Sequence, residues 1–112
     1  YRSSAQAAAD LEREARSLGR RFGSLPADLT QPDAPSQVVE AAVGLLGGLD
    51  ILINNAGSLV ARRTLEEADD AFWTEVLDLN VGSLRRVSRA AAPHLKEAGL
   101  KRGGAAIVNL SS

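Results

Sequence analysis

The chain has 112 residues, 45% of them hydrophobic and 24% charged, which suits one soluble globular domain of modest size. With 13 basic and 14 acidic residues the net charge is −1, so charge gives no reason to expect nucleic acid or an anionic membrane as a partner. The lack of Cys excludes disulfides and thiol chemistry, and a single His cannot build a metal cluster. Because no apolar run approaches the roughly 20 residues of a membrane span and no signal peptide is seen, we expect a cytoplasmic protein without metal.

The first predicted helix begins within residues 3–6, where Ser3 and Gln6 have the spacing of a capping box. Apolar residues then recur at helical spacing, and these are Ala8, Leu11, Ala15 and Leu18. Gly19 is placed to end the helix, since glycine tolerates the left-handed conformation common there.

A short, weak strand is predicted within residues 21–30. Pro26 lies inside it and favours an edge position or an early end. Pro32 and Pro35 then mark a loop that leads into a second helix. That helix has a wide apolar face, formed by Val38, Val39, Ala42, Val43, Leu45 and Leu46, and Gly47 and Gly48 end it.

The stretch 49–57, Leu-Asp-Ile-Leu-Ile-Asn-Asn-Ala-Gly, organises the rest of the chain. Its apolar run is short and rich in β-branched residues, which is typical of a buried parallel strand. Such strands end at the edge of an open α/β sheet where ligands bind. Gly57 permits a sharp turn or a close approach of the backbone. The alternative is a strand-ending turn without function.

Two helical segments and a strand complete the pattern. Residues 64–67, Thr-Leu-Glu-Glu, form a capping box that predicts a helix starting near Leu65, with Phe72 and Trp73 as core or groove lining. A long helix follows over Val76 to Leu95, which Pro93 should kink or shorten. Its first apolar stripe contains Leu77, Val81, Leu84, Ala91 and Leu95. Residues 105–110 form the last strand, and the alternation of strands and helices predicts an α/β fold with a parallel sheet.

Four positions, in order along the chain, resemble the short-chain dehydrogenase/reductase family of the classical type. Asp28 matches the acidic residue after the family's third strand, and residues 54–57, Asn-Asn-Ala-Gly, match its signature after the fourth strand. Asn80 matches the Asn of the family's catalytic tetrad, and Ser112 matches the catalytic Ser after the fifth strand. The resemblance covers essentially the whole chain.

The resemblance implies a partial Rossmann-like doubly wound parallel sheet, made of the third to fifth strands with flanking helices. Residues 1–112 would be an incomplete NAD(P)-binding domain, cut from a longer protein, that lacks the amino-terminal Gly-rich turn and the later Tyr-x-x-x-Lys segment. In the strand order 3-2-1-4-5-6, the third strand would either stand apart by roughly 10 Å or close up on residues 49–54. Residues Ile51–Asn54 and Ile107–Leu110 should pair in parallel.

By the same resemblance, the parent protein transfers a hydride between a nicotinamide and a small carbonyl or alcohol substrate, and this chain alone is inactive. Ser112 would hydrogen-bond the substrate oxygen, and the backbone carbonyl of Asn80 would hold a relay water. Cofactor contacts are expected from Asp28 at the adenine and from its neighbour Leu29, and also from Asn55, Ala56 and Gly57. The alternatives are local: Ser112 as a turn residue, Asn80 as a helix-bending residue, and Asp28 as a residue leading into a helix.

The start of the chain bears on the choice of cofactor. In dinucleotide folds an acidic residue after the second strand binds the ribose 2′-hydroxyl, whereas an Arg there favours a 2′-phosphate. Here Tyr1 takes the acidic position, with Arg2 and Ser3 following. We therefore expect NADP, with NAD as the alternative, unless Arg2 merely begins a solvated helical turn.

Some alternatives stay open. The parent could be a non-catalytic dinucleotide-binding relative that acts as a sensor or scaffold, or the 112 residues could be a whole truncated product. A homo-oligomer is expected through the long helix Val76–Leu95, whose second apolar stripe contains Val76, Leu79, Val87 and Ala90. The substrate and the direction of the reaction do not follow from this sequence.

Overall fold

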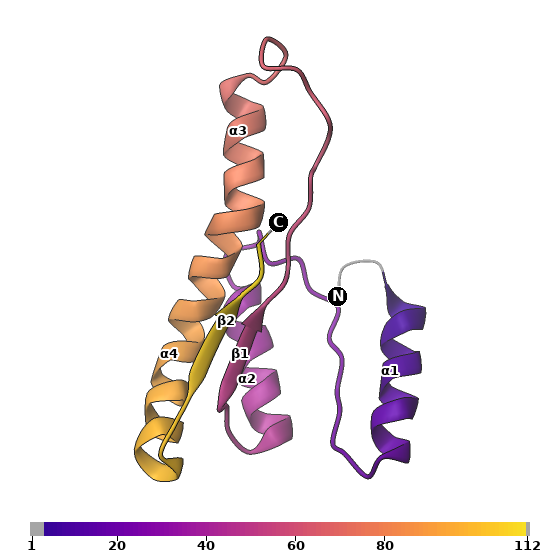
Figure 1. Ribbon diagram of the computed structural model, residues 1–112, viewed down its shortest axis with the longest axis vertical. Helices are drawn as coiled ribbons and strands as arrows, with labels where there is room; N and C mark the ends of the chain where they lie inside the picture. The colour runs from indigo at the N-terminus through magenta and orange to yellow at the C-terminus, as the bar shows by residue number, and fades with distance from the viewer. Residues whose placement is uncertain (1–3, 112) are drawn as a thin grey trace.

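The computed structural model describes residues 4–111. Four α-helices and two strands alternate along this part of the chain (Figure 1). They are α1 (Ala5–Ser17), α2 (Ala34–Leu46), β1 (Ile51–Asn54), α3 (Asp70–Leu77), the π-helical segment η1 (Asp78–Gly82), α4 (Ser83–Arg102) and β2 (Ala106–Asn109). Among the described residues, no helix is long and apolar enough to cross a membrane.

The sheet consists of β1 and β2, which run parallel. Ile51 lies opposite Ala106, and Asn54 lies opposite Asn109. The ladder extends by one bond at each end, from Ala106 N–H to the Asp50 carbonyl at 2.9 Å and from Leu110 N–H to the Asn54 carbonyl at 3.0 Å. The predicted parallel pairing of these two segments is confirmed, and so is the α/β fold class.

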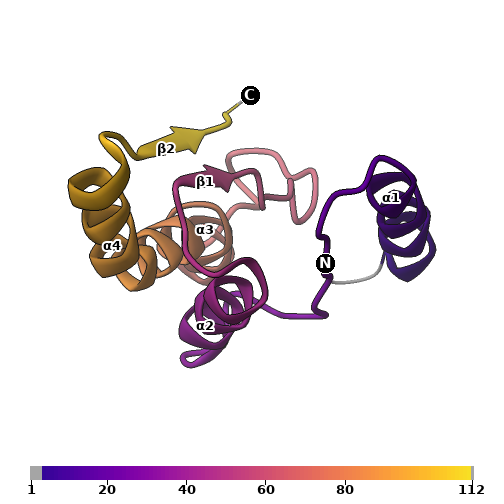
Figure 2. The ribbon, with the colours of Figure 1, turned by 90° about the horizontal axis from the view of Figure 1, so that it is seen from below.

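Helices α2 and α4 cover the same face of this sheet (Figure 2). The buried core lies between the helices and the sheet and consists of Val39, Leu49, Val87, Ala91 and Leu95. Leu52 of β1 packs against this core, whereas its neighbours Ile51 and Ile53 are each 59% exposed. Side chains alternate across a strand, so one face of the sheet is packed and the other is open.

The predicted strand within residues 21–30 is not formed. Residues 20–28 have no regular secondary structure and run apart from β1 (Figure 1), so of the two expected arrangements the structure has the gap. A strand is defined by its ladder, and the described chain places no partner beside this segment. Arg21 holds it instead, by donating from Nη2 to the Leu46 carbonyl at 2.9 Å.

Of the two helix starts predicted from capping boxes, one differs in the structure and the other involves a residue that the structure does not describe. Residues 65–67 form only a turn, and the helix begins at Asp70 after Asp69, whose carboxylate accepts a bond from Phe72 N–H at 2.8 Å. At the predicted capping box, one of the two reciprocal bonds is present: Thr64 N–H donates to the Glu67 side chain at Oε2, at 3.2 Å. The capping box at Ser3 lies outside the described residues, although α1 itself ends before Gly19 as expected, with φ of 68° at that glycine.

The long helix is interrupted at η1 rather than at Pro93. Helix α4 continues past Pro93 to Arg102 and ends at Gly103. The π segment places one extra residue in its turn, which shifts the helix faces by about 100°. The predicted first stripe is therefore split: Leu77 and Val81 are 54% and 57% exposed, while Ala91 and Leu95 are buried.

The second stripe was expected to face a partner subunit, and for Val87 this is wrong. Val87 is only 7% exposed and belongs to the core of this chain. Ala90, from the same stripe, also packs against that core. Val87 and Ala90 are apolar because this part of α4 packs on α2 and β1.

Candidate functional site

A cleft of about 720 Å³ lies at the carboxyl ends of β1 and β2. Its walls come from three segments that are distant in sequence: the loop after β1, the α3–η1–α4 rod, and the residues after β2. The lining residues are Asn54, Asn55, Ala56, Gly57, Ser58, Leu59, Val76, Asn80, Val81, Leu84, Asn109, Leu110 and Ser111. Ligands of open α/β sheets bind at this edge.

Asn80 fastens the loop after β1 to the helix. From the middle of η1, its Nδ2 donates to the Ser58 carbonyl at 3.0 Å and to the Val76 carbonyl at 2.9 Å, while its Oδ1 accepts from Ser58 N–H at 2.9 Å. The side-chain amide therefore satisfies both backbone groups of Ser58 and one carbonyl released by the π turn. Asn80 lines the cleft, and its side chain holds the loop after β1 against the helix.

Gly57 is explained by the same contact. A Cβ atom added at Gly57 would lie 2.8 Å from Oδ1 of Asn80, which is closer than real Cβ contacts allow. The backbone can approach the amide only because residue 57 has no side chain. The contact that explains Gly57 is thus made within the chain.

An asparagine pair, with Asn54 buried and Asn109 exposed, joins the two strand ends that line the cleft. Asn54 is 8% exposed, and its Nδ2 donates to Asn109 Oδ1 at 2.8 Å and to Ser88 Oγ at 3.0 Å. Because Asn54 and Asn109 are opposite each other in the ladder, the bond fixes the spacing of both strands where the cleft begins. No sequence motif singled out Asn109 or Ser88, although both strands do end in Asn.

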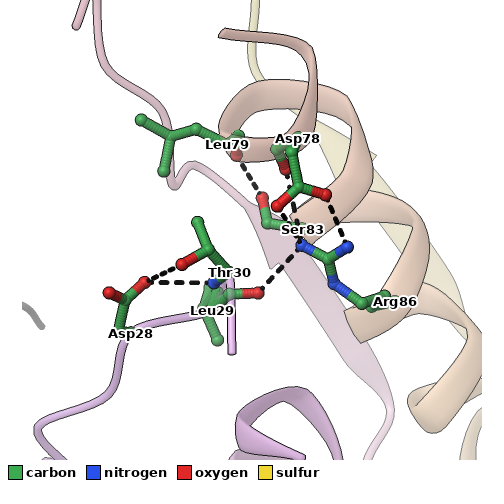
Figure 3. Close-up of polar contacts among 7 residues, drawn as sticks. All are labelled: Asp28, Leu29, Thr30, Asp78, Leu79, Ser83 and Arg86. Atoms are coloured by element: carbon green, nitrogen blue, oxygen red, sulfur yellow. Dashed lines mark hydrogen bonds and ion pairs between the residues drawn. The ribbon is translucent and has the colours of Figure 1, made fainter. Parts of the chain in front are cut away.

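Asp28 does not line the cleft. Its Oδ1 accepts from Thr30 N–H at 3.1 Å and from Thr30 Oγ1 at 2.7 Å, which closes a local turn. Asp28 lines a separate hollow of about 370 Å³ between the extended segment and the start of α2. The next residue, Leu29, packs against the core, and its carbonyl accepts from Arg86 Nη2 at 3.2 Å (Figure 3). The structure thus brings together Asn55, Ala56, Gly57 and Asn80 and leaves Asp28 outside this group.

Arg86 and Asp78 form an ion pair beside the π segment. Nη1 donates to Asp78 Oδ1 at 2.7 Å and Nη2 to Oδ2 at 3.1 Å, a two-pronged contact that Figure 3 shows from the side of α4. The guanidinium hydrogen bond holds the pKa of the Asp78 carboxyl below its usual range, and the carboxylate raises the pKa of Arg86. The eight-residue spacing is not an ordinary helical pair, so no standard motif signals it.

The other candidate site residues predicted from the sequence either lie outside the described part of the chain or do not line the cleft. Ser112, Arg2 and Ser3 lie outside the described residues. Trp73 is 46% exposed and so does not belong to the core. The guanidinium carbon of Arg63 lies over the ring of Phe72, 4.6 Å from the ring centre. The described residues contain no cluster of three or more His, Cys, Asp or Glu that could hold a metal.

Comparison with known proteins finds relatives that are named dehydrogenases. At 41% identity over 95 residues, the chain is similar to 2-dehydro-3-deoxy-D-gluconate 5-dehydrogenase of Escherichia coli, and the match covers 85% of this chain and 36% of that one. Cis-4-hydroxycyclohexanecarboxylate dehydrogenase of Sinomonas cyclohexanicum is 32% identical, over 96% of this chain and 42% of that one.

Solved structures agree with these relatives. A crystal structure of the NADH-dependent reductase A1-R′ complexed with NAD superposes with a TM-score of 0.86 at 36% identity, over 94% of this chain and 44% of that one. A short chain dehydrogenase from Burkholderia cenocepacia in complex with NADP gives a TM-score of 0.77 at 35% identity, over 85% of this chain and 38% of that one. The chain therefore spans less than half the length of these proteins. The family model for short chain dehydrogenases matches residues 1–112, and the chain belongs to that family.

Proposed function

We propose that these residues are the central part of an NAD(P)-dependent oxidoreductase that transfers a hydride between a nicotinamide and a small carbonyl or alcohol substrate. The observation that carries this proposal is the clasp of Asn80 on Ser58, which forms one wall of a cleft at the carboxyl ends of β1 and β2. Several relatives of this chain are named as dehydrogenases, which supports the proposed class of reaction.

The cleft suits a nicotinamide in size and position. Its volume of about 720 Å³ lies within the roughly 300–1,000 Å³ of ligand pockets. The backbone of Asn55, Ala56 and Gly57 offers polar groups along one wall, with no bulky side chain in the way. These residues would hold the nicotinamide end, and Asp28 and Leu29 the adenine end. The bound nicotinamide would supply or accept the hydride.

Two residues of the chain are proposed to act in the reaction. The side-chain amide of Asn80 is engaged with Ser58 and Val76, and its backbone carbonyl would hold the relay water that the family resemblance implies. Ser112, the next residue in sequence after Ser111 of the cleft lining, would hydrogen-bond the reacting oxygen and stabilise its developing charge. The proton donor Tyr and its Lys are expected outside these residues, so we propose that the chain alone is inactive.

Cofactor choice and assembly are further parts of the proposal. Arg2 favours NADP through a forked contact to a 2′-phosphate, with NAD as the alternative, and solved relatives carry either one. We place an oligomer contact on the α3–η1 part of the long helix. There Trp73, Leu77 and Val81 follow one another at intervals of four and are 46%, 54% and 57% exposed.

The test compares this chain with the complete protein. Titration with NADPH, followed by nicotinamide fluorescence, should give saturable binding for the complete protein and none in the micromolar range for residues 1–112. The complete protein should also oxidise or reduce members of an alcohol and ketone panel. Binding without turnover across that panel would favour the sensor or scaffold alternative, and a micromolar site on residues 1–112 alone would contradict the proposed division of the protein.

A further inference from the structure

Arg86 joins two segments that are 57 residues apart in sequence. Its Nη2 donates to the Leu29 carbonyl at 3.2 Å while its two terminal nitrogens hold the Asp78 carboxylate at 2.7 Å and 3.1 Å. Figure 3 shows the guanidinium between the turn that carries Asp28 and the first residue of η1. A single side chain therefore sets the distance between that turn and the helix.

The turn that Arg86 reaches is itself closed. Asp28 accepts two bonds from Thr30, and Gln31 N–H donates to the Asp28 carbonyl at 3.0 Å. Residues 28–31 therefore form one hydrogen-bonded turn, and the carbonyl of Leu29 points from that turn toward Arg86. Because Leu29 directly follows Asp28 in this turn, a change in the position of Leu29 would also change that of Asp28.

At the other end of the Arg86 side-chain contacts, the ion pair with Asp78 is also closely packed. The ion pair lies over Gly82, where an added Cβ would come within 2.5 Å of Asp78 Oδ1 and 3.2 Å of Arg86 Nη1. Ser83, 1% exposed, donates its hydroxyl to the Leu79 carbonyl in the same turn. The lack of a side chain at Gly82 thus leaves room for the guanidinium beside the Asp78 carboxylate.

Stability alone is a weak reason for this arrangement. The Arg86 Nε is buried, and no hydrogen-bond acceptor for it lies among residues 4–111. An unpaired buried N–H is unfavourable, and partly buried ion pairs add little net stability. What the guanidinium supplies is a fixed geometry between two partners, which its planar fork suits and a Lys ammonium does not.

We propose that Arg86 is a positioning residue for the adenine half of the dinucleotide: anchored on Asp78, it holds the Leu29 carbonyl and thereby sets the place of Asp28. This inference rests on the proposed function, in which Asp28 meets the adenine. It gives the ion pair a role in cofactor affinity and none in the chemical step.

The test uses Arg86→Met in the complete protein. The Michaelis constant for the dinucleotide should rise on the order of tenfold, the size expected if the displaced Asp28 loses one hydrogen bond to the adenine. Turnover at saturating dinucleotide should stay within about threefold of the unchanged protein. The inhibition constant of AMP, which carries the adenine but no nicotinamide, should rise in parallel with the Michaelis constant.

Three further variants separate positioning from folding. Arg86→Lys keeps the charge without the fork and should recover only part of the affinity. Gly82→Ala keeps both charged groups but displaces them, so it should also weaken AMP binding. Arg89→Met removes an exposed Arg one turn further along α4 and should change neither constant.

Each outcome has a definite meaning. If Arg86→Met and Gly82→Ala bind AMP as tightly as Arg89→Met in an active protein, the inference is wrong and the proposed function stands. A fall in turnover and melting temperature without a change in AMP binding would make Arg86 merely structural and would also overturn it. If the unchanged complete protein binds no dinucleotide, the proposed function fails and the inference fails with it. Should Arg86→Met not fold, Arg86→Lys and Gly82→Ala decide.

Discussion

The two ends of the described chain are held together in different ways. From α2 to β2 the chain encloses a core with Val39, Val87, Ala91 and Leu95 between helices and sheet. In α1 only Ala8 is buried, while Leu11 and Leu18 are 55% and 68% exposed. The amino-terminal helix therefore follows local preference, whereas the remainder follows packing. Our proposal assigns different roles to these two ends: Arg2 at the start of the chain selects the cofactor, and Ser112 at its end contacts the reacting oxygen.

The largest expected effect is on stability, and it tests the packing contrast directly. Leu95→Ala should lower the free energy of unfolding of the complete protein by about 2–5 kcal/mol, because Leu95 is 7% exposed in the core. Leu18→Ala is the comparison variant, because Leu18 is 68% exposed among residues 4–111, and its effect should stay within about 0.5 kcal/mol if no other part of the complete protein covers α1. Urea unfolding followed by circular dichroism measures both. Equal losses would show that α1 is packed in solution as firmly as α4.

Next in size is the effect of Ser112→Ala on catalysis by the complete protein. Turnover should fall ~10²–10³-fold, as for the loss of one donor to a developing oxyanion, while the dissociation constant of NADPH stays nearly unchanged. Steady-state kinetics and a fluorescence titration give the two numbers. Turnover equal to that of the unchanged protein would remove Ser112 from the mechanism.

Arg2→Ala tests the opposite end of the chain and should show the opposite kinetic pattern. The Michaelis constant for NADPH should rise by about tenfold, the size expected for one charge-assisted hydrogen bond, with turnover preserved. The value for NADH serves as the internal control, since NADH lacks the 2′-phosphate. If both constants rise together, Arg2 does not read that phosphate.

The smallest expected effect comes from the ion pair that joins the two regions. The hydrogen bond from Arg86 lowers the pKa of Asp78 in the folded chain, so its contribution is present above the unfolded value of about 3.9 and is lost as pH falls through the lower folded value. Asp78→Asn should therefore flatten the acid limb of a plot of melting temperature against pH, below about pH 4. An acid limb identical to that of the unchanged protein would show that Asp78 carries no such linkage.

Sequence patterns predicted what depends on local chemistry. The strand at 51–54 and the glycine that follows α1 could both be read from spacing and residue type. Asn80 was singled out by the family resemblance, and its place in the cleft lining does not test the role assigned to it. The strand expected near Pro26 could not, because pairing needs a neighbour that the described chain does not place there. The pattern in the sequence was real, but the interaction that would convert it into a strand is not local.

The long helix shows a different limit of sequence patterns. Spacings of four and three from Leu77 to Leu95 indicate one continuous apolar face, and Pro93 marks the obvious interruption. The actual interruption is η1, where Asn80 and Ser83 bond backbone carbonyls and one extra residue enters the turn. Apolar periodicity cannot reveal such a shift, so the exposed Leu77 and the buried Leu95 were assigned to one face.

The parallel register of the sheet also has a consequence for the order of assembly. Asn54 and Asn109 are ladder partners 55 residues apart, so the strands can meet only after a long stretch of chain is in place. The helices between them depend on near neighbours and should form earlier. We therefore expect α2 and α4 each to form before β1 and β2 pair. Until β2 arrives, the backbone groups of β1 on that side have no partner, which makes this the stage most open to aggregation.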